Sequence, residues 1–338
     1  MSKAKKRPIR KRKRKPFQAP PSLKHSELFR WADYFELACL YNSDKSISKG
    51  DIYCIMEPLL RDSIIDKEEF ESSDDCSDKD IFPPNETKND QYRFFCDELF
   101  KMLEYRAWVY KAFYPFKIKE GNLLELKPSL QIKCKLYIYL LSCSNLSFFK
   151  DAQSKLTTDF EILSKESLKR FVSSKAEIHH FGANVRPSSY TGNLYSKIVK
   201  LAEDLNCDLI AQKEDFSSKD SGDGGLDIVA WYPFKDLKWS RFIILAQCKC
   251  SEEWVDLRFS SSLEAWQGKI RFTNPINNMT FIPMCYRRCN GAWHKNHNVS
   301  GTILIDRQRL IDCLGDNVDF FKKYNSLKYV DEIVGLNL

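Results

Sequence analysis

The sequence predicts an α/β protein in which a mainly helical N-terminal part precedes a part where helices and strands alternate. Apolar residues recur at helical spacing through much of residues 23–175. After residue 175, an amphipathic helix at 192–206 is followed by short apolar runs that glycine, proline and polar residues interrupt, a pattern typical of strands. A chain of 338 residues is long enough for two such domains.

The composition indicates a globular protein with a sizeable core. Hydrophobic residues, among them 23 Phe and 7 Trp, make up 43% of the chain, which excludes a protein that is disordered throughout. The longest apolar run, near 136–143, is too short to span a bilayer, so we expect no membrane segment. Twelve Cys are scattered without a short paired framework or a secretory signal. This pattern of cysteines favours a reducing compartment, which would be the cytoplasm or, in a eukaryote, the nucleus.

The N-terminal residues 1–22 are predicted to form a basic disordered tail. Residues 3–15 hold ten Lys or Arg and show no apolar periodicity, whereas the whole chain has a formal net charge of +7. The rest of the chain is therefore net acidic. Such a tail would attract nucleic-acid phosphates in a salt-dependent way, while a nuclear-localisation signal and a solubilising tail are the alternatives.

Residues 23–175 are predicted to form a mainly helical accessory domain with an acidic linker at 64–90 that contains Pro83-Pro84. We found no repeat and no motif in it, so its partner could be DNA, another protein or a second copy of the chain. Its helical patterns cover residues 26–62 with a turn at 48–51, 91–113, 123–149 and 160–172.

Residues 176–338 are predicted to form the second domain. Helix 192–206 leads into a strand at 207–211, and strands 226–231 and 242–248 follow as a hairpin. The remaining elements are a helix at 261–272, strands at 279–284 and 301–305, and a helix at 307–314.

The hairpin carries polar residues where a buried strand would have none. A glycine-rich turn that contains Asp223 precedes the first strand, which begins with Leu226 and Asp227. Gln247 and Lys249 end the second strand and project from the same face, because side chains alternate across a strand. Charges are rarely placed on apolar strands unless they are paired or functional. A salt bridge between Asp227 and Lys249 is the structural alternative to a functional site.

The pattern Asp227…Gln247-x-Lys249, together with the order helix, strand, hairpin, helix, strand, resembles the PD-(D/E)xK nuclease superfamily and within it the Mrr-like restriction endonucleases. The resemblance implies a restriction-endonuclease-like αβββαβ core and a DNA endonuclease that depends on Mg²⁺ or Mn²⁺. Restriction, or defence against foreign DNA, is the implied biological role. The alternative is a nuclease-fold protein that binds DNA or acts as a scaffold without catalysis.

The resemblance also implies roles for individual residues. Asp227 and the Gln247 amide oxygen would bind the metal ion, and Lys249 would orient the attacking water and offset negative charge at the phosphate. Glutamine in place of an acid removes one negative charge from the metal site. Several Mrr-like enzymes carry an additional acid on the first core helix, and on helix 192–206 Glu203 is the first candidate and Asp204 the second.

The segment after strand 279–284 has three interpretations. Cys285, Cys289, His294 and His297 resemble a structural zinc set, although their spacing matches no familiar finger. Basic and aromatic residues in the same segment would suit DNA contact by phosphate binding and stacking, and an ordinary loop is the third interpretation. The residues considered for DNA contact are Arg287, Arg288 and Lys295 with Tyr286 and Trp293, and Lys269 or Gln267 on helix 261–272.

Two further expectations concern histidines and partners. His179 and His180 are adjacent, so in a strand they would point to opposite faces and pack rather than chelate one metal together.

DNA is the expected partner, and a homodimer would be the simplest way to cut both strands. The phosphate-binding pattern GxxxxGK[ST] does not occur, so any ATP-driven motor would be a separate NTPase or other defence-system partner.

Overall fold

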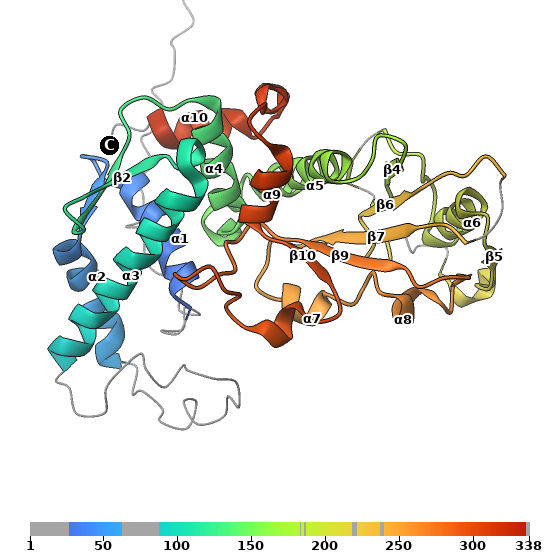
Figure 1. Ribbon diagram of the computed structural model, residues 1–338, viewed down its shortest axis with the longest axis horizontal. Helices are drawn as coiled ribbons and strands as arrows, with labels where there is room; N and C mark the ends of the chain where they lie inside the picture. Colours follow the sequence, from blue (N-terminus) through green and yellow to red (C-terminus); the bar gives the residue numbers. More distant parts are fainter. Residues whose placement is uncertain are drawn as a thin grey trace, which may run out of the picture.

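The computed structural model describes residues 27–62, 88–182, 184–185, 187–217, 222–236 and 240–335. The predicted basic tail and most of the predicted acidic linker lie outside these ranges. Within them the protein is a mixed α/β structure (Figure 1). None of the helices in these ranges is both long and apolar enough to cross a membrane.

The N-terminal part contains helices and a small sheet. Its helices are α1 (Leu28–Tyr41), α2 (Lys49–Asp62), α3 (Lys88–Tyr110), α4 (Ile132–Cys143) and α5 (Gln153–Phe171). Its strands are β1 (Ser46–Ser48), β2 (Phe116–Lys119) and β3 (Leu123–Leu126), in the antiparallel order β1-β3-β2.

The prediction of helix from residue 123 is wrong for the first four residues, which form β3. Glu120 and Gly121 both have positive φ angles and form the tight turn of the β2–β3 hairpin. The alternation Phe116-Lys117-Ile118-Lys119 is the strand pattern that precedes this turn.

The central sheet has five strands in the order β10-β9-β7-β6-β4. Strand β6 runs antiparallel to both of its neighbours, β4 and β7, whereas β9 runs parallel to both of its neighbours, β7 and β10. The strands are β4 (Glu177–His180), β6 (Ile228–Trp231), β7 (Ile243–Cys248), β9 (Asn277–Phe281) and β10 (Ile303–Ile305). The prediction of the hairpin and of the two strands after it is therefore confirmed, with small shifts in their bounds.

The first strand of the central sheet is not the predicted one. Residues 207–211 contribute only β5 (Asp208–Leu209), which pairs with β8 (Ile270–Arg271) in a separate two-stranded sheet. The place of the first strand is taken by β4, and α5 precedes it. Helix α6 (Leu194–Leu205), which the sequence predicts well, belongs to an insertion between β4 and β6. The predicted helix 261–272 shortens to α8 (Leu263–Trp266) followed by β8.

The two histidines of β4 pack as predicted. The His179 ring stacks on Trp231 of β6, with ring centroids 5.1 Å apart. His180 is buried, and burial lowers the pKa of its ring to about 3.

Helices cover both faces of the central sheet (Figure 1). Ile228 and Ala246 belong to the same core as the α5 residues Leu156, Phe160 and Leu163. On the opposite face, Val229 and Leu245 pack in a second core. That second core also contains Ile198, Leu201 and Leu205 of α6 and Trp266 of α8.

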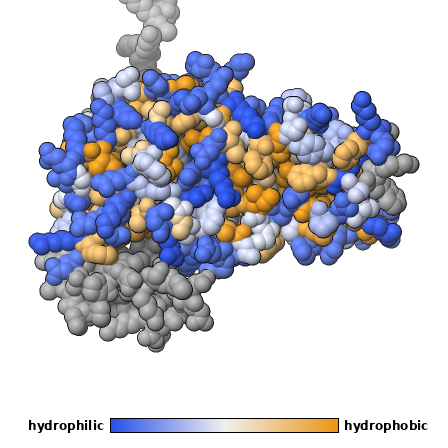
Figure 2. Space-filling model, in the orientation of Figure 1, coloured by the Kyte–Doolittle hydropathy of each residue, from blue (hydrophilic) through white to orange (hydrophobic). Residues whose placement is uncertain are grey.

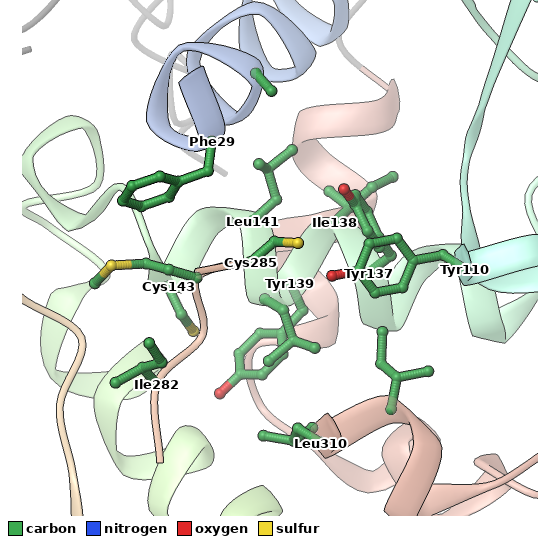
Figure 3. Packing of buried hydrophobic residues seen from close by; sticks show 14 of the residues in the cluster. Phe29, Tyr110, Tyr137, Ile138, Tyr139, Leu141, Cys143, Ile282, Cys285 and Leu310 are labelled. Atoms are coloured by element: carbon green, nitrogen blue, oxygen red, sulfur yellow. The ribbon is translucent and has the colours of Figure 1, made fainter. Parts of the chain in front are cut away.

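The first of these cores runs through the predicted domain boundary at residue 175. It extends from α1 across α4 and α5 to the sheet, and it includes α9 (Arg307–Leu314) and α10 (Leu327–Gly335) near the C-terminus. Helix α9 packs on α5, and α10 packs on α4. In Figure 3, residues far apart in the chain meet in this core: Phe29, Tyr110, Tyr137, Ile138, Tyr139, Leu141 and Cys143 with Ile282, Cys285 and Leu310.

A buried ionic network joins the helical part to α9. Arg307 donates to both carboxylate oxygens of Asp33 at 3.0 and 2.8 Å. Arg106 lies 2.7 Å from Asp33 Oδ1 and 2.9 Å from Glu36 Oε2. Tyr137 donates to Glu36 at 2.9 Å. All five residues are fully or almost fully buried, so each charge depends on the others for compensation.

Candidate functional site

Asp227 is held by backbone contacts at the start of β6. Its carbonyl oxygen accepts N–H bonds from Phe181 (2.8 Å) and Gly182 (3.3 Å), just beyond β4. Its own N–H donates to Ala246 on β7 at 3.0 Å. The carboxylate oxygen Oδ2 accepts the N–H of Cys248 at 2.7 Å, and the residue is only 5% exposed. The carboxylate is therefore fixed against the end of β7 by a backbone donor and not by an ion pair with Lys249.

Glu161 of α5 brings a second carboxylate to Asp227. It is also 5% exposed, and its Oε1 accepts a hydrogen bond from Asn184 Nδ2 at 2.8 Å. Its Oε2 is buried and has no hydrogen-bond partner among the described residues. A Cβ atom built on Gly182 would lie 3.4 Å from this oxygen and 3.3 Å from Asp227 Oδ1. Both carboxylates therefore border the same small space beside Gly182.

The electrostatics of Glu161 reflect this placement. Burial raises the pKa of its carboxyl group to about 7, and the neighbouring charge of Asp227 acts in the same direction. The hydrogen bond from Asn184 and the positive charge of Lys249 oppose the rise. A buried acid with a pKa near neutrality, beside a second acid, is typical of a functional site.

The pKa of the Asp227 carboxyl group is raised for similar reasons. Burial raises its pKa to about 6, with a further contribution from the charge of Asp223. The Cys248 N–H and the Lys249 ammonium act in the opposite direction. Lys249 is half-buried, and its N–H donates to Phe281 on β9 at 2.9 Å, which fixes its backbone next to the two acids. A cation between the two carboxylates would relieve their mutual repulsion.

Gln247 is completely buried and anchors the segment after β7. Its Nε2 donates to the carbonyl of Leu257 at 2.7 Å and lies 3.4 Å from the Thr280 hydroxyl. Its Oε1 is buried and has no hydrogen-bond partner in the part of the chain that the structure describes. An amide oxygen without a partner is available as a ligand, although its nitrogen already has a structural role.

The glycine turn before β6 allows a close approach of two segments. Gly224 and Gly225 have φ angles of 61° and 81°, which favour glycine. A Cβ atom on Gly225 would lie 2.5 Å from Ser260 Cβ, so no other residue fits there. Asp223 Oδ1 accepts the Gly225 N–H at 2.8 Å. Asp223 therefore shapes the turn and adds negative charge near the two buried acids.

The prediction that Glu203 supplies the additional acid is wrong. Glu203 is exposed on α6, which does not precede the first strand of the central sheet. The neighbouring Asp204 accepts a hydrogen bond from Tyr190 at 3.0 Å, and its carbonyl accepts one from Arg241 at 2.9 Å. Arg241 precedes β7, so the end of α6 lies at the opposite end of that strand from Lys249. Figure 1 shows α6 and β5 at the far right of the sheet.

Glu161 is the acid that occupies the place expected for Glu203. Its helix, α5, directly precedes β4 and packs on β4 and β7. In the sequence, Glu161 lies three and seven residues before Ser164 and Leu168, which share the buried side of α5. An acid on the buried face of an amphipathic helix was the available signal for this residue.

The structure does not gather the predicted zinc set. Cys285 is buried in the main core, and the ring of His294 packs between Phe29 and Tyr286. Burial lowers the pKa of His294 to about 4. Over the described ranges no three His, Cys, Asp or Glu side chains are arranged to hold a metal ion, so the zinc interpretation of Cys285, Cys289, His294 and His297 has no structural support.

The two arginines predicted to contact DNA make an ion pair, a ring contact and hydrogen bonds within the protein. Arg287 pairs with Asp306 at 2.9 Å and lies over the Trp293 ring at 4.0 Å. Arg288 donates to the carbonyl of His294 at 3.0 and 3.1 Å. These bonds shape the loop and give both guanidinium groups protein partners, so contact of Arg287 and Arg288 with DNA stays a prediction.

The two lysines predicted to contact DNA, Lys269 and Lys295, lie in different surroundings. Lys269 donates to the carbonyl of Ala265 and lies over the Trp266 ring, so it packs on its own short helix. Lys295 is half-buried, and Gln267 is exposed.

Figure 2 shows hydrophilic side chains over much of the visible face, with an apolar area over the central sheet.

The residues around Gly182 fit a divalent metal ion that takes part of its coordination from substrate and water. Hard cations such as Mg²⁺ prefer oxygen ligands and are often bound through one or two carboxylates plus phosphate oxygens. Glu161 and Asp227 supply two carboxylates, Glu161 Oε2 has no hydrogen-bond partner within the described ranges, and Gly182 places no side chain between the two acids. No protein-family model, no curated protein and no solved structure matches this chain.

Proposed function

We propose that this protein is a metal-dependent DNA endonuclease with a restriction-endonuclease-like core. The observation that carries the proposal is the meeting of the Glu161 and Asp227 carboxylates beside Gly182, within electrostatic reach of Lys249. DNA as the substrate, and restriction or defence as the role, follow from the sequence resemblance and from the basic N-terminal segment.

The order of the elements supports the proposed fold. Helix α5 is followed by the antiparallel strands β4, β6 and β7, then by the short helices α7 (Trp254–Leu257) and α8, and then by β9 parallel to β7. This is the αβββαβ order that the resemblance implies, with α6 and β5 inserted between the first two strands. The insertion explains why an acid on α5, and not on α6, lies near Asp227.

Each residue of the site has a chemical role in phosphodiester hydrolysis. Mg²⁺ or Mn²⁺, when bound, would polarise the scissile phosphate and acidify a coordinated water. Glu161 and Asp227 would hold the ion, and Gln247 Oε1, to which no described residue donates a hydrogen bond, is the candidate for a further oxygen ligand. Lys249 would bind the phosphate and offset the negative charge that develops during the reaction.

Plasmid cleavage tests the proposal. We expect the full-length protein to nick or linearise plasmid DNA with Mg²⁺ or Mn²⁺, and we expect Lys249→Ala and Glu161→Gln to reduce the rate by at least about 100-fold, as loss of a catalytic group usually does. Lys175→Ala and Glu203→Gln are matched controls, because both side chains are exposed. If all five proteins cut equally or not at all, this site does not cleave DNA.

A nuclease-fold protein that binds DNA without cutting it is the second candidate. Two features favour it: Gln247 in place of an acid, and only two carboxylates beside Gly182 in the part of the chain described. In that case DNA binding would be salt-sensitive and would survive Lys249→Ala, while no metal would induce cleavage. A homodimer or an NTPase partner remains a proposal for either candidate.

A further inference from the structure

We infer that Asn184 is a positioning residue that holds Glu161 toward Asp227. It donates one hydrogen bond to Glu161 Oε1 and so leaves Oε2 facing the space beside Gly182. This inference rests on the proposed function, because it concerns how the proposed metal-binding acids are held in place.

One short segment contacts both acids. The N–H groups of Phe181 and Gly182 donate to the carbonyl of Asp227, and the side chain of Asn184, two residues later, donates to Glu161. The acids come from different elements, the start of β6 and the middle of α5. The segment after β4 therefore connects them and sets their relative position.

The bond to Asn184 has a defined direction. A carboxylate oxygen only accepts hydrogen bonds, so the amide nitrogen of Asn184 must be the group that faces Glu161. Glu161 has several rotatable bonds, and a hydrogen bond to one of its carboxylate oxygens restricts which way the carboxylate points. Because the donor is on Oε1, no residue in the described part of the chain bonds to the buried Oε2.

A purely structural role would give a different result. If the Asn184 bond only satisfied a buried carboxylate, its loss would lower stability and leave metal binding unchanged. If it positions Glu161, its loss would weaken metal binding even in a variant that is well folded. Residues that orient metal ligands typically change metal affinity by about 10- to 100-fold when they are replaced.

The experiment measures Mn²⁺ binding to the full-length protein by electron paramagnetic resonance at pH 8, without DNA. We expect Asn184→Ala to weaken Mn²⁺ binding by about 10-fold or more, and Asn184→Gln, which keeps the amide donor, to recover part of that loss. Asn290→Ala is the matched control, because Asn290 is an exposed loop residue that accepts only a local backbone bond from Ala292. Circular dichroism selects variants with the parent spectrum, and Asn184→Ser replaces Asn184→Ala if that protein does not fold.

The outcomes separate the inference from the proposed function. If the parent binds Mn²⁺ and a folded Asn184→Ala or Asn184→Ser variant binds it equally well, the inference is wrong, while the proposed metal-dependent function is not contradicted. If the parent binds no Mn²⁺, both are wrong. Weaker binding in the Asn184 variant alone, with Asn290→Ala unchanged, supports the inference.

Discussion

Two acids, one at the start of β6 and one in the middle of α5, are buried, and burying their charges lowers the stability of the folded protein. Glu161 and Asp227 are 95% buried, and no Lys or Arg forms an ion pair with either within the described residues. Asp227 accepts a hydrogen bond from one backbone N–H and Glu161 from one amide, and the nearby charge of Lys249 also favours the ionised form of both. Such a site lowers the free energy of unfolding unless a bound ligand compensates the negative charges. Functional sites commonly lower stability in this way.

This cost predicts how stability changes with pH. The pKa of Glu161 is raised to about 7 in the folded protein, so the folded state binds more protons than the unfolded state between about pH 4.5 and 7. The free energy of unfolding should therefore fall as the pH rises through this window. Glu161→Gln should remove that loss and be more stable than the parent at pH 8, by an amount on the order of 2 kcal/mol.

Urea unfolding at pH 5 and pH 8 without divalent metal checks this prediction. The two proteins should differ more at pH 8 than at pH 5, since Glu161 is largely protonated at the lower pH. Glu203→Gln is the control and should follow the parent at both pH values, because Glu203 is exposed. A parent that is more stable than Glu161→Gln at pH 8 would contradict the placement of Glu161 in a site without a compensating cation.

Gly182 gives a second prediction at the residue scale. A methyl group there would lie 3.3 Å from Asp227 Oδ1 and 3.4 Å from Glu161 Oε2. Its backbone is not in the left-handed region, so alanine fits the main chain. We expect Gly182→Ala to fold but to bind Mn²⁺ at least about 10-fold more weakly, because the methyl group occupies the space between the ligands.

Gly268→Ala is the control for Gly182→Ala. A Cβ atom at Gly268 would meet no atom within 4 Å, so this variant should bind Mn²⁺ as the parent does. Titration of both variants with Mn²⁺ makes the comparison. Unchanged binding by Gly182→Ala would mean that the metal lies elsewhere.

At the scale of elements, the sequence predicts the hairpin better than the connection that leads to it. Strands β6 and β7 are apolar runs separated by a polar connection, and Asp227 and Lys249 interrupt the apolar pattern, so the local signal is strong. Strand β4 has the sequence Glu-Ile-His-His, with a single aliphatic residue, because it is an edge strand that pairs on one side only. Periodicity could not identify it as the first strand of the sheet.

The strong pattern of α6 also explains why Glu161 was missed. Helix α6 has a clear apolar face and is the last helix predicted before strand 207–211 and the glycine turn, so sequence order alone makes it the first core helix. Its position as an insertion depends on the pairing of β4 with β6, which joins residues about 50 positions apart. Such pairing is a property of the folded sheet and is not contained in any local stretch of sequence.

The insertion can be tested through its helix cap. Asn193 Oδ1 accepts the N–H of Ser196 at 2.9 Å at the start of α6. We expect Asn193→Ala to lower the free energy of unfolding by about 1 kcal/mol, as loss of such a cap usually does, and to leave Mn²⁺ binding within about twofold of the parent. Urea unfolding and Mn²⁺ titration measure the two effects, and a large loss of metal binding would mean that α6 contributes to the site after all.

At the scale of the molecule, the helical part and the central sheet share one hydrophobic core, and the ionic network of Asp33, Glu36, Arg106 and Arg307 crosses between them. The sequence predicts two domains because its composition and its periodicity change near residue 175. The contact of α9 with α5, and of Arg307 with Asp33 over 274 positions, could not be predicted from either property.

The last prediction concerns this connection. Arg307→Met should lower the free energy of unfolding by about 3 to 5 kcal/mol, because among the described residues it leaves the buried Asp33 and Glu36 carboxylates with Arg106 as their only arginine partner. Lys322→Met is the control: its ion pair with Asp319 is exposed, so its loss should cost less than about 1 kcal/mol. Urea unfolding followed by circular dichroism and by Trp fluorescence should give one coincident transition for the parent, since a shared core unfolds as a unit. Two separate transitions, with Arg307→Met affecting only one of them, would instead favour two independent domains.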